Sequence, residues 1–303
     1  MQTQKRRYSV ERAKSRAGML MVLPSVLLLC IFVIYPIIDS FILSIYNYNL
    51  LSDVKKFIGF NNYVRAFNDP RFWNAFSNTI YFTVVYVPLL LLFSLLLALA
   101  INSKVPGSSA FQTIFFLPAI TSMAIVSIVW RFLLDGDIGF FAILLKSIGI
   151  RVVDPLRDMH LAMPTIIAVS LWRWVGFNMV ILLSGLKSIS ADYYEAASLD
   201  GATSVQKFFS ITLPLLLPSL SFVFLTNFIS SFQVFDQVYV MTKGGPMFKT
   251  EVLVQYIYYQ GFNIFNMGYA SALSLLLFVL IFIFSIFQLK SYIKAEKERG
   301  FVQ

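Results

Sequence analysis

The sequence predicts an all-α membrane protein in which six transmembrane helices carry a two-helix loop on the cytoplasmic side. Three observations lead to this fold class: the composition, the length of the apolar runs and the positions of the basic residues. Hydrophobic residues make up 58% and charged residues 13% of the 303 residues, and the mean hydropathy is +0.75. These values lie far from the balance of soluble domains, so we expect a polytopic membrane protein.

Apolar runs long enough to cross about 30 Å of hydrocarbon recur along the chain. Uncharged runs occur at residues 19–38, 78–101, 111–130, 213–235 and 263–289, and a sixth run, residues 161–186, is broken only by Arg173. The predicted spans are residues 18–45, 77–101, 111–134, 161–186, 213–240 and 263–289, within a membrane domain of residues 18–290 that includes a loop at 187–212. The first run is too long, and too poor in a small-residue cleavage site, for a removable signal peptide. We therefore expect it to be retained as span one.

Basic residues are concentrated in two predicted tails, residues 1–17 and 291–303, and just before the second tail. They are Lys5, Arg6, Arg7, Arg12, Lys14, Arg16, Lys290, Lys294, Lys297 and Arg299. Because cytoplasmic segments are enriched in Lys and Arg, both termini are expected in the cytoplasm, which requires an even number of spans. The tails also explain most of the net charge of +9. The sequence has no basic stripe interleaved with aromatic residues of the kind that binds nucleic acid, so nucleic acid is not an expected partner. We expect the chain to be surrounded by membrane lipid.

Residues for enzymatic chemistry are scarce in this sequence. Cys30 and His160 are its single cysteine and single histidine, which makes a metal cluster, a catalytic dyad or an internal disulfide poorly supported. We expect Cys30 to be a buried residue of span one and His160 to lie in a solvated loop. No phosphate-binding GxxxxGK[ST] motif occurs. If ATP drives the protein, another chain must bind the nucleotide, and no cofactor is expected on this one.

The loop at 187–212 is polar and carries local signals for two short helices. Asp192 followed by Glu195 has the spacing of a capping box, and Gly201 suits the left-handed residue that ends a helix. Thr203 and Gln206 repeat the capping box, which starts a second helix predicted at residues 205–212. The following Pro214 disfavours helical geometry in the residue before it, so we expect this helix to end there.

The same loop resembles a known family. Its sequence EAASLDGATSVQKFFSITLPLLLP, residues 195–218, is similar to the coupling loop, or EAA loop, of permease subunits of bacterial ABC importers. The resemblance implies an importer-type transmembrane domain whose loop docks on ATPase subunits. The implied ATPase-coupling residues are Glu195, Ala196, Ala197, Asp200 and Gly201. Without the resemblance, Glu195 would be read as a simple helix cap and Gly201 as a simple turn.

The resemblance also implies partners and a cellular location. The chain would pair with a second homologous permease and with two cytoplasmic ATPase subunits that hold ATP and Mg. An extracytoplasmic binding protein would deliver the substrate, and the complex would lie in the bacterial cytoplasmic (inner) membrane.

A second stretch narrows the implied substrate. The sequence FDQVYVMTKGGP, residues 235–246, is similar to the region after span five in carbohydrate-type permeases, as are Pro118 and Trp130. A carbohydrate or related polyol is therefore the expected cargo. Gly176 and Ala142 depart from the family pattern, which has proline and asparagine at these positions, and this weakens a residue-by-residue transfer of substrate contacts.

Polar residues inside the spans predict where a substrate would pass. Arg173 lies roughly 18 to 21 Å from either end of span four, near mid-depth, where an arginine is a candidate functional residue. The predicted substrate-pathway residues are Trp172, Arg173, Asn178, Asn227, Ser231 and Gln233. The alternative is a polar cluster that holds the helices together. Near the outer ends of spans three and five, Arg131 and Asp236 could form a gate.

Two other classes of protein compete with an ABC importer permease. A stand-alone secondary transporter or channel for a small polar solute would also carry charges within its spans, but it does not require the capped loop. Dependence of uptake on ATP rather than on an ion gradient would separate the two. A membrane enzyme is the third class, and the missing nucleophile and metal ligands weaken it.

Overall fold

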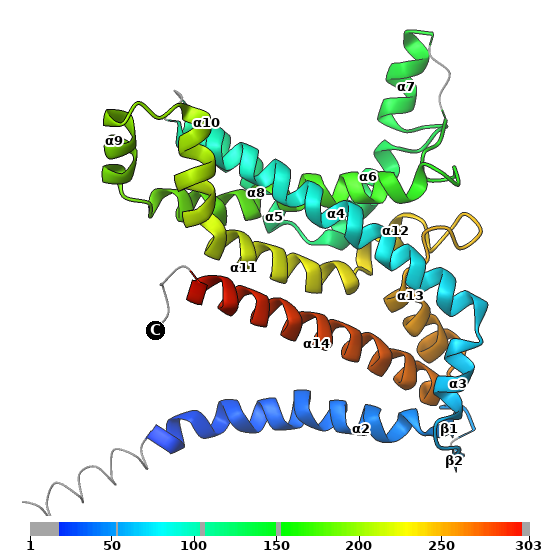
Figure 1. The fold of residues 1–303 in the computed structure, drawn as a ribbon. Helices are drawn as coiled ribbons and strands as arrows, with labels where there is room; N and C mark the ends of the chain where they lie inside the picture. The colour runs from blue at the N-terminus through cyan, green and yellow to red at the C-terminus, as the bar shows by residue number, and fades with distance from the viewer. Residues whose placement is uncertain (1–17, 53, 104–106, 150–152, 299–303) are drawn as a thin grey trace, which may run out of the picture. The chain divides into compact units, whose positions relative to one another are not determined.

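The computed structural model describes residues 18–52, 54–103, 107–149 and 153–298 (Figure 1). Within these ranges the regular secondary structure is helical except for one two-stranded antiparallel sheet, and turns and loops connect the helices. The chain divides into two compact units, the first made of residues 1–66 and 260–275 and the second of residues 67–259 and 276–303. The predicted tail at 1–17 and the end of the C-terminal tail lie outside the described residues.

Helices that are long and apolar enough to cross a membrane occur at all six predicted spans. Single helices are Gly18–Ser44, Pro70–Asn102 (α4), Ala162–Lys187 (α8), Ser204–Phe232 and Met267–Ser291, the last within α14 (Met267–Glu298). Span three is instead a pair of helices, α5 (Ser108–Ile120) and α6 (Met123–Leu133), bent by 99° at their junction. The predicted helical fold is confirmed, and the third apolar run forms a bent pair of helices rather than a single one.

The first unit contains the end of span one and a small hairpin. Span one ends in a π-helical segment, η1 (Cys30–Ile34), and α2 (Tyr35–Ser44). The strands β1 (Tyr46–Tyr48) and β2 (Lys55–Phe57) follow, and then α3 (Asn61–Phe67). The hairpin was not predicted, because three-residue strands are too short to show an alternating pattern in the sequence.

Cys30 is exposed at the surface of the chain, so its predicted burial is wrong. No residue of η1 is buried, and Ser44 is the one buried residue of α2. A span can be apolar without being covered by its own chain, because lipid or a partner covers it instead.

Helix α8 is the central helix of the second unit. Of its most apolar stretch, 61% is buried, against 28% or less for the other four single-helix spans. One face packs on α4 and on span five through Met179, Leu182, Leu216 and Val223, all buried. The helix that carries Arg173 is therefore surrounded by protein on most of its circumference.

Short helices and an ion pair complete the second unit. They are α7 (Phe140–Ser147), α12 (Asp236–Met241) and α13 (Leu253–Tyr258), and the π-helical segment η3 (Tyr259–Asn263) follows. Helix α7 follows the bent span three. The segment between α12 and α13 is fixed to the start of α4 by Arg71, whose Nε and Nη2 donate to the two carboxylate oxygens of Glu251 at 2.8 and 2.7 Å.

Candidate functional sites: the exposed loop, the bent span and a charged pocket

The loop predicted to couple begins with α9 (Ala191–Leu199). Its N-terminal cap is Ser190, whose hydroxyl accepts a hydrogen bond from the Asp192 N–H at 3.3 Å and donates to the Asp192 carboxylate at 3.0 Å. The predicted capping box of Asp192 and Glu195 is therefore wrong, because the N-cap lies two residues earlier, at Ser190. Because Ser190 has extended backbone geometry and can cap, Asp192 enters the first helical turn and Glu195 is left exposed to solvent.

Gly201 ends α9 in the way that the sequence predicts. Its φ of +77° is left-handed, and the N–H groups of Gly201 and Ala202 donate to the carbonyls of Ser198 and Ala197 at 3.1 and 2.9 Å. A Cβ added at Gly201 would meet nothing within 4 Å, so the turn faces open space. A side chain here would be strained by the backbone, and it would project outward from the loop.

The second helix of the loop starts as predicted and ends differently. Thr203 and Gln206 form the predicted capping box, with bonds of 3.3 and 2.8 Å between each side chain and the other residue's N–H. Helix α10 (Ser204–Lys207), the π-helical segment η2 (Phe208–Thr212) and α11 (Leu213–Phe232) then form one continuous helix.

The predicted helix end before Pro214 is thus wrong. The Leu213 N–H donates to the carbonyl of Phe208, five residues earlier, so the backbone is widened just before the proline. Pro214 lies in the first turn after this segment, where its missing N–H is tolerated. As a result the second loop helix is a direct extension of span five (Figure 1).

The loop is exposed to solvent, and its two arms, α9 and α10, are held together by a hydrogen bond. Neither α9 nor α10 contains a buried residue, and Leu199 is 90% exposed. The two arms are joined where Lys207 donates to the Ser198 hydroxyl at 2.6 Å. Ala197, Asp200 and Gly201 line one side of a cleft of about 330 Å³ between the arms. Glu195 and Ala196 lie on the exposed surface of α9.

Arg173 lies inside the second unit and binds the bend of span three. It is 7% exposed; its Nε and Nη2 donate to the Thr121 carbonyl at 3.1 and 2.6 Å, and Nη2 also reaches the Ala119 carbonyl at 3.4 Å. The Trp174 ring lies 4.1 Å from the guanidinium carbon. Arg173 therefore binds carbonyl groups that the end of α5 leaves without helical partners, at the negative end of the helix dipole.

Asn178 and Asn227 form a pair of amides between α8 and α11. The Asn227 Nδ2 donates to Asn178 Oδ1 at 2.8 Å, and the reciprocal distance is 3.5 Å. Both residues are buried, at 1% and 8% exposure. These contacts are the ones expected if the polar residues hold helices together, which was the alternative to substrate binding.

The other predicted pathway residues lie apart from this pair. Trp172 is 49% exposed and its ring packs edge-on against Trp130, with ring centres 5.5 Å apart. Ser231 is buried and donates to the Phe228 carbonyl within its own helix at 2.7 Å. Gln233 is exposed at the C-terminal cap of α11. The structure thus brings together Asn178 and Asn227, and Arg173 lies on the same helix as Asn178.

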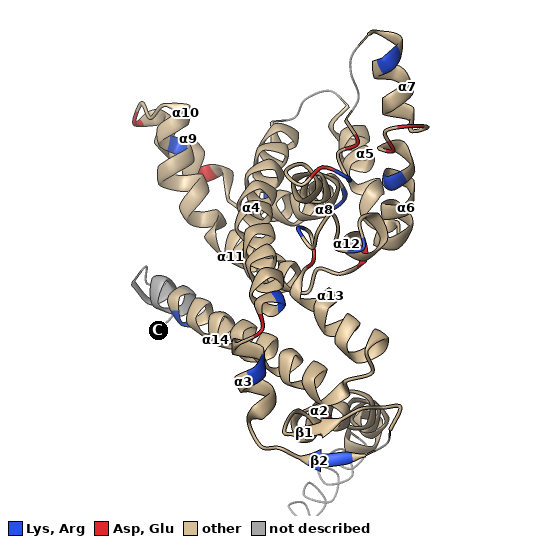
Figure 2. Ribbon diagram, turned by 90° about the vertical axis from the view of Figure 1, so that its right-hand side faces the viewer, with Lys and Arg blue, Asp and Glu red and all other residues tan. Residues whose placement is uncertain are grey.

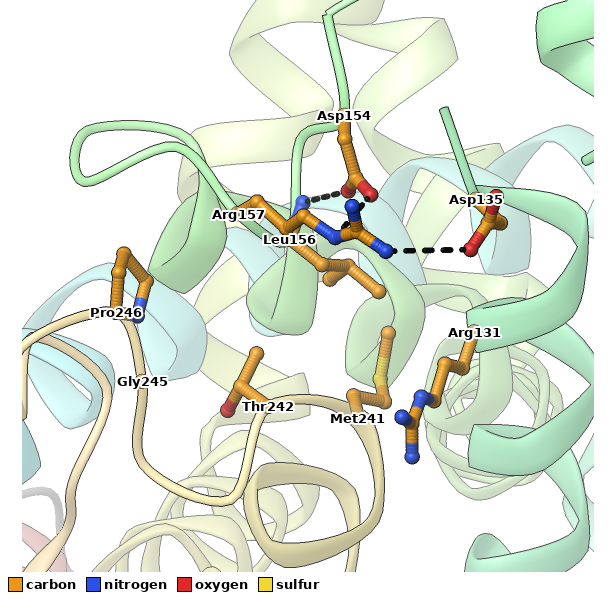
Figure 3. A pocket seen from close by; sticks show the side chains of 9 residues that line it. All are labelled: Arg131, Asp135, Asp154, Leu156, Arg157, Met241, Thr242, Gly245 and Pro246. Atoms are coloured by element: carbon orange, nitrogen blue, oxygen red, sulfur yellow. Dashed lines mark hydrogen bonds and ion pairs between the residues drawn. The ribbon is translucent and has the colours of Figure 1, made fainter. Parts of the chain in front are cut away.

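A charged pocket of about 290 Å³ lies near the Ala162 end of α8 (Figure 3). The Arg157 guanidinium lies 3.2 Å from the Asp154 carboxylate and 3.8 Å from that of Asp135. The N–H groups of Asp137 and Ile138 donate to the Asp135 carboxylate and hold the pKa of Asp135 below its ordinary value.

Arg131 lines this pocket but does not pair with Asp236 in this structure. Its Nη1 donates instead to the Val240 carbonyl at 3.2 Å, while Asp236 is exposed at the start of α12. No ion pair among the described residues joins Arg131 to Asp236. The gate formed by these two residues stays a prediction.

The junction between α5 and α6, residues 120–122, is a feature of the structure that was not predicted. Ile120 is 69% exposed, and Thr121 and Ser122 are also exposed. All three lie in the middle of the apolar run that forms span three. The available signal was Pro118 followed by the polar pair Thr121 and Ser122. Before the bend α5 lies close against α8, where a Cβ on Gly176 would overlap the backbone of Phe115.

Charged residues are distributed as a membrane protein requires. Figure 2 shows that most blue and red positions lie at helix ends and in loops, while the long helices are largely tan. In the part of the chain that the structure describes, no group of three or more metal-binding side chains occurs. The fold and the exposed loop define a helical membrane permease.

Comparison with known proteins gives the family. Residues 63–292 match the family of binding-protein-dependent transport system inner membrane components, and the chain belongs to this family. It is therefore a multi-pass transport subunit of the inner membrane and is not the catalytic subunit of its system. Because the family depends on a binding protein, a transporter or channel that works alone is not supported.

Relatives of similar length match almost end to end. The lactose transport system permease protein LacF of Rhizobium radiobacter is 36% identical over 288 residues, covering 93% of this chain and 96% of that protein. The trehalose/maltose permease protein MalF of Thermococcus litoralis is 32% identical over 277 residues, covering 91% and 94%. A chain of the bacterial alginate ABC transporter, in complex with its alginate-bound periplasmic protein, superposes with a TM-score of 0.80 at 25% identity, covering 92% and 94%.

Proposed function

We propose that this chain is the permease subunit of an ATP-driven importer for a carbohydrate or related polyol. Relatives named for lactose and for trehalose and maltose support the class of cargo. The chain pairs with a second homologous permease, receives cargo from an extracytoplasmic binding protein, and is driven by two cytoplasmic ATPase subunits that hold ATP and Mg. Both termini and the loop at 187–212 lie in the cytoplasm.

The observation that carries this proposal is the continuity of the exposed loop with span five. An ATPase subunit that grips Glu195, Ala196 and Ala197 on α9, together with the turn at Asp200 and Gly201, holds a surface that nothing in the described chain covers. Because α10 runs into α11 as one helix, movement of the gripped loop is passed directly to span five.

The bend of span three supports a substrate path beside α8. From Ser108 to Thr121 helix α5 rises about 20 Å, which places the bend well inside a hydrocarbon layer of about 30 Å. Exposed non-helical backbone is tolerated at this depth only where it faces protein or a water-filled cavity. We therefore place residues 120–122 on the path or against the second permease, with Trp172, Asn178, Asn227, Ser231 and Gln233 as further candidates for its lining.

Substitution of Gly201 tests the coupling role. Gly201→Asp forces a side chain onto a left-handed residue, at about 1–2 kcal/mol, and into the docking surface. Gly149→Asp is the matched control, because Gly149 also has a positive φ of 75° with nothing within 4 Å, but it lies far along the chain from the loop. We expect both variants to insert in the membrane. Gly201→Asp alone should lose uptake and copurification of the ATPase subunits.

Normal uptake by a well-expressed Gly201→Asp protein would overturn the coupling role. Equal loss in both glycine variants would show that only backbone strain was measured. Asn227→Ala separately tests the path: an altered KM for uptake, with the complex still assembled, would support a contact with cargo, and an unchanged KM would exclude it.

A further inference from the structure

Helix α8 is joined to each of its neighbours by a polar contact within little more than two turns. These contacts are Ser94 Oγ to the Val175 carbonyl at 3.1 Å, Gln237 Nε2 to Ser170 Oγ at 3.2 Å, the Asn178–Asn227 amide pair, and Arg173 to the carbonyls of the bend. We name Ser170, Arg173 and Asn178 the polar belt of α8. Through the belt α8 contacts α11, α12 and the bent span, and the neighbouring Val175 carbonyl joins α8 to α4.

The polar belt and the exposed loop join α8 and α11 at two points. We call the two helices, the loop and the Asn178–Asn227 contact the frame. Helix α8 ends at Lys187 and leads through a short cap into α9, while α10 and α11 return as one helix. About 14 Å above Lys187 the amides of Asn178 and Asn227 join the two spans again. Buried leucines, among them Leu182 and Leu216, fill the space between these two connections. A closely packed frame of this kind moves as a unit when the loop is displaced.

Arg173 connects this frame to the bend of span three. It lies five residues, or about 7.5 Å, above Asn178 on the same helix. Its planar fork holds the carbonyls of Ala119 and Thr121 together, which are the last groups before the chain turns into α6. Gly176 lets the backbone of α5 approach α8 closely at Phe115. This close packing leaves little room for α5 to move relative to α8.

We propose that Arg173 is a positioning residue that makes the bend between α5 and α6 follow α8 when the loop moves. The inference rests on the proposed function and adds the route from the loop to the path. The Nη1 of Arg173 is buried and has no hydrogen-bond partner in this structure. A buried donor of this kind is costly, and it is available to a carbonyl of the bend in a second arrangement of the helices.

Arg173→Lys in the assembled, reconstituted complex tests the proposal. Lysine keeps the positive charge but cannot hold two carbonyls with a rigid fork. We expect normal assembly and ATP hydrolysis, an unchanged KM for cargo-loaded binding protein, and a fall of about tenfold in cargo transported per ATP. Arg65→Lys is the control for a charge-preserving change outside the belt, since Arg65 stacks on Tyr269 at 4.0 Å in the first unit.

A second readout follows the bend itself. In a Cys30→Ser background, Ser122→Cys should react with a polar thiol reagent at a rate that changes with the nucleotide state of the ATPases. Adding Arg173→Lys should make this rate independent of nucleotide. Nucleotide-dependent labelling and an unchanged ratio of cargo to ATP in Arg173→Lys would overturn the proposal. A raised KM alone would instead assign Arg173 to cargo binding.

The two ideas fail in different ways. If the proposed coupling role is wrong, Gly201→Asp retains its ATPase subunits and its uptake. If only the inference is wrong, Gly201→Asp loses both while Arg173→Lys remains fully coupled.

Discussion

The amide pair between α8 and α11 allows a quantitative test of the frame. Replacing Asn178 or Asn227 by leucine, which has nearly the same shape, removes one amide and leaves the other buried. Each remaining amide keeps one bond, since Asn178 also donates to the Trp174 carbonyl and Asn227 to the Val223 carbonyl, at 2.9 and 2.8 Å. We therefore expect each single variant to lose about 1 kcal/mol, near the lower end of the cost of an unsatisfied buried group.

The coupling between the two residues is the informative quantity. Of the two amide contacts, the one at 2.8 Å has good hydrogen-bond length and the one at 3.5 Å is marginal. Polar contacts between membrane helices average about 0.6 kcal/mol and reach about 1.7 kcal/mol in double-mutant cycles. The variant with both leucines should therefore be more stable, by about this amount, than the sum of the single changes predicts.

Unfolding by a graded addition of SDS to the protein in mild detergent measures the four members of the cycle. The control cycle combines Asn178→Leu with Ser230→Ala, because the Ser230 hydroxyl donates to the Thr226 carbonyl of its own helix, at 2.9 Å. This control should be additive within about 0.5 kcal/mol. If the Asn178–Asn227 cycle were equally additive, the two amides would not be coupled. The proposal that they join α8 to α11 would then be refuted.

Two further predictions concern the close contact at span three and the turn beside the charged pocket. Gly176→Ala should lose about 1–3 kcal/mol, because its Cβ meets the Phe115 backbone, while Gly18→Ala, with nothing within 4 Å, should change little; thermal unfolding in detergent measures both. The N–H groups of Asp137 and Ile138 lower the pKa of Asp135 in the folded protein. These bonds therefore stabilise the turn fully above the unfolded pKa of about 4, and this stabilisation is lost as the pH falls through the lowered pKa of the folded state. Amide exchange protection at residues 136–139 should fall on acidification in the native protein and stay pH-independent in Asp135→Asn.

Local signals in the sequence predicted the loop well. The left-handed Gly201 and the capping box of Thr203 and Gln206 depend on residues within one turn of each other, so the chain itself specifies them. The first cap was misplaced because Ser190 and Asp192 are both good capping residues. Existence of the spans was predictable for a similar reason, since the length of an apolar run is a local property.

Contacts between distant segments could not be predicted in this way. Counting residues placed Arg173 at mid-depth, but only the fold shows that its partners are the carbonyls of Ala119 and Thr121, more than fifty residues earlier. The same holds for Pro214, whose effect on its helix was cancelled by the π-helical segment before it. For Arg173 the missing information lies in a distant segment, and for Pro214 it lies in a backbone widening that residue preferences do not specify.

The partners of Arg173 also explain how an arginine is tolerated inside a span. An ionised group at this depth is costly unless its donors are matched, and a bent helix offers the matching groups, because the end of α5 leaves carbonyls unpaired. The bend and the arginine thus satisfy each other: without Arg173 the Thr121 carbonyl would lose its two donors, and without the bend the guanidinium would lose three bonds. A contact with this mutual dependence is a natural point for moving one span by displacing another. Since lysine can neutralise the end of α5 but lacks the rigid planar fork that donates through both Nε and Nη2, Arg173→Lys distinguishes transmission of movement from simple charge balance.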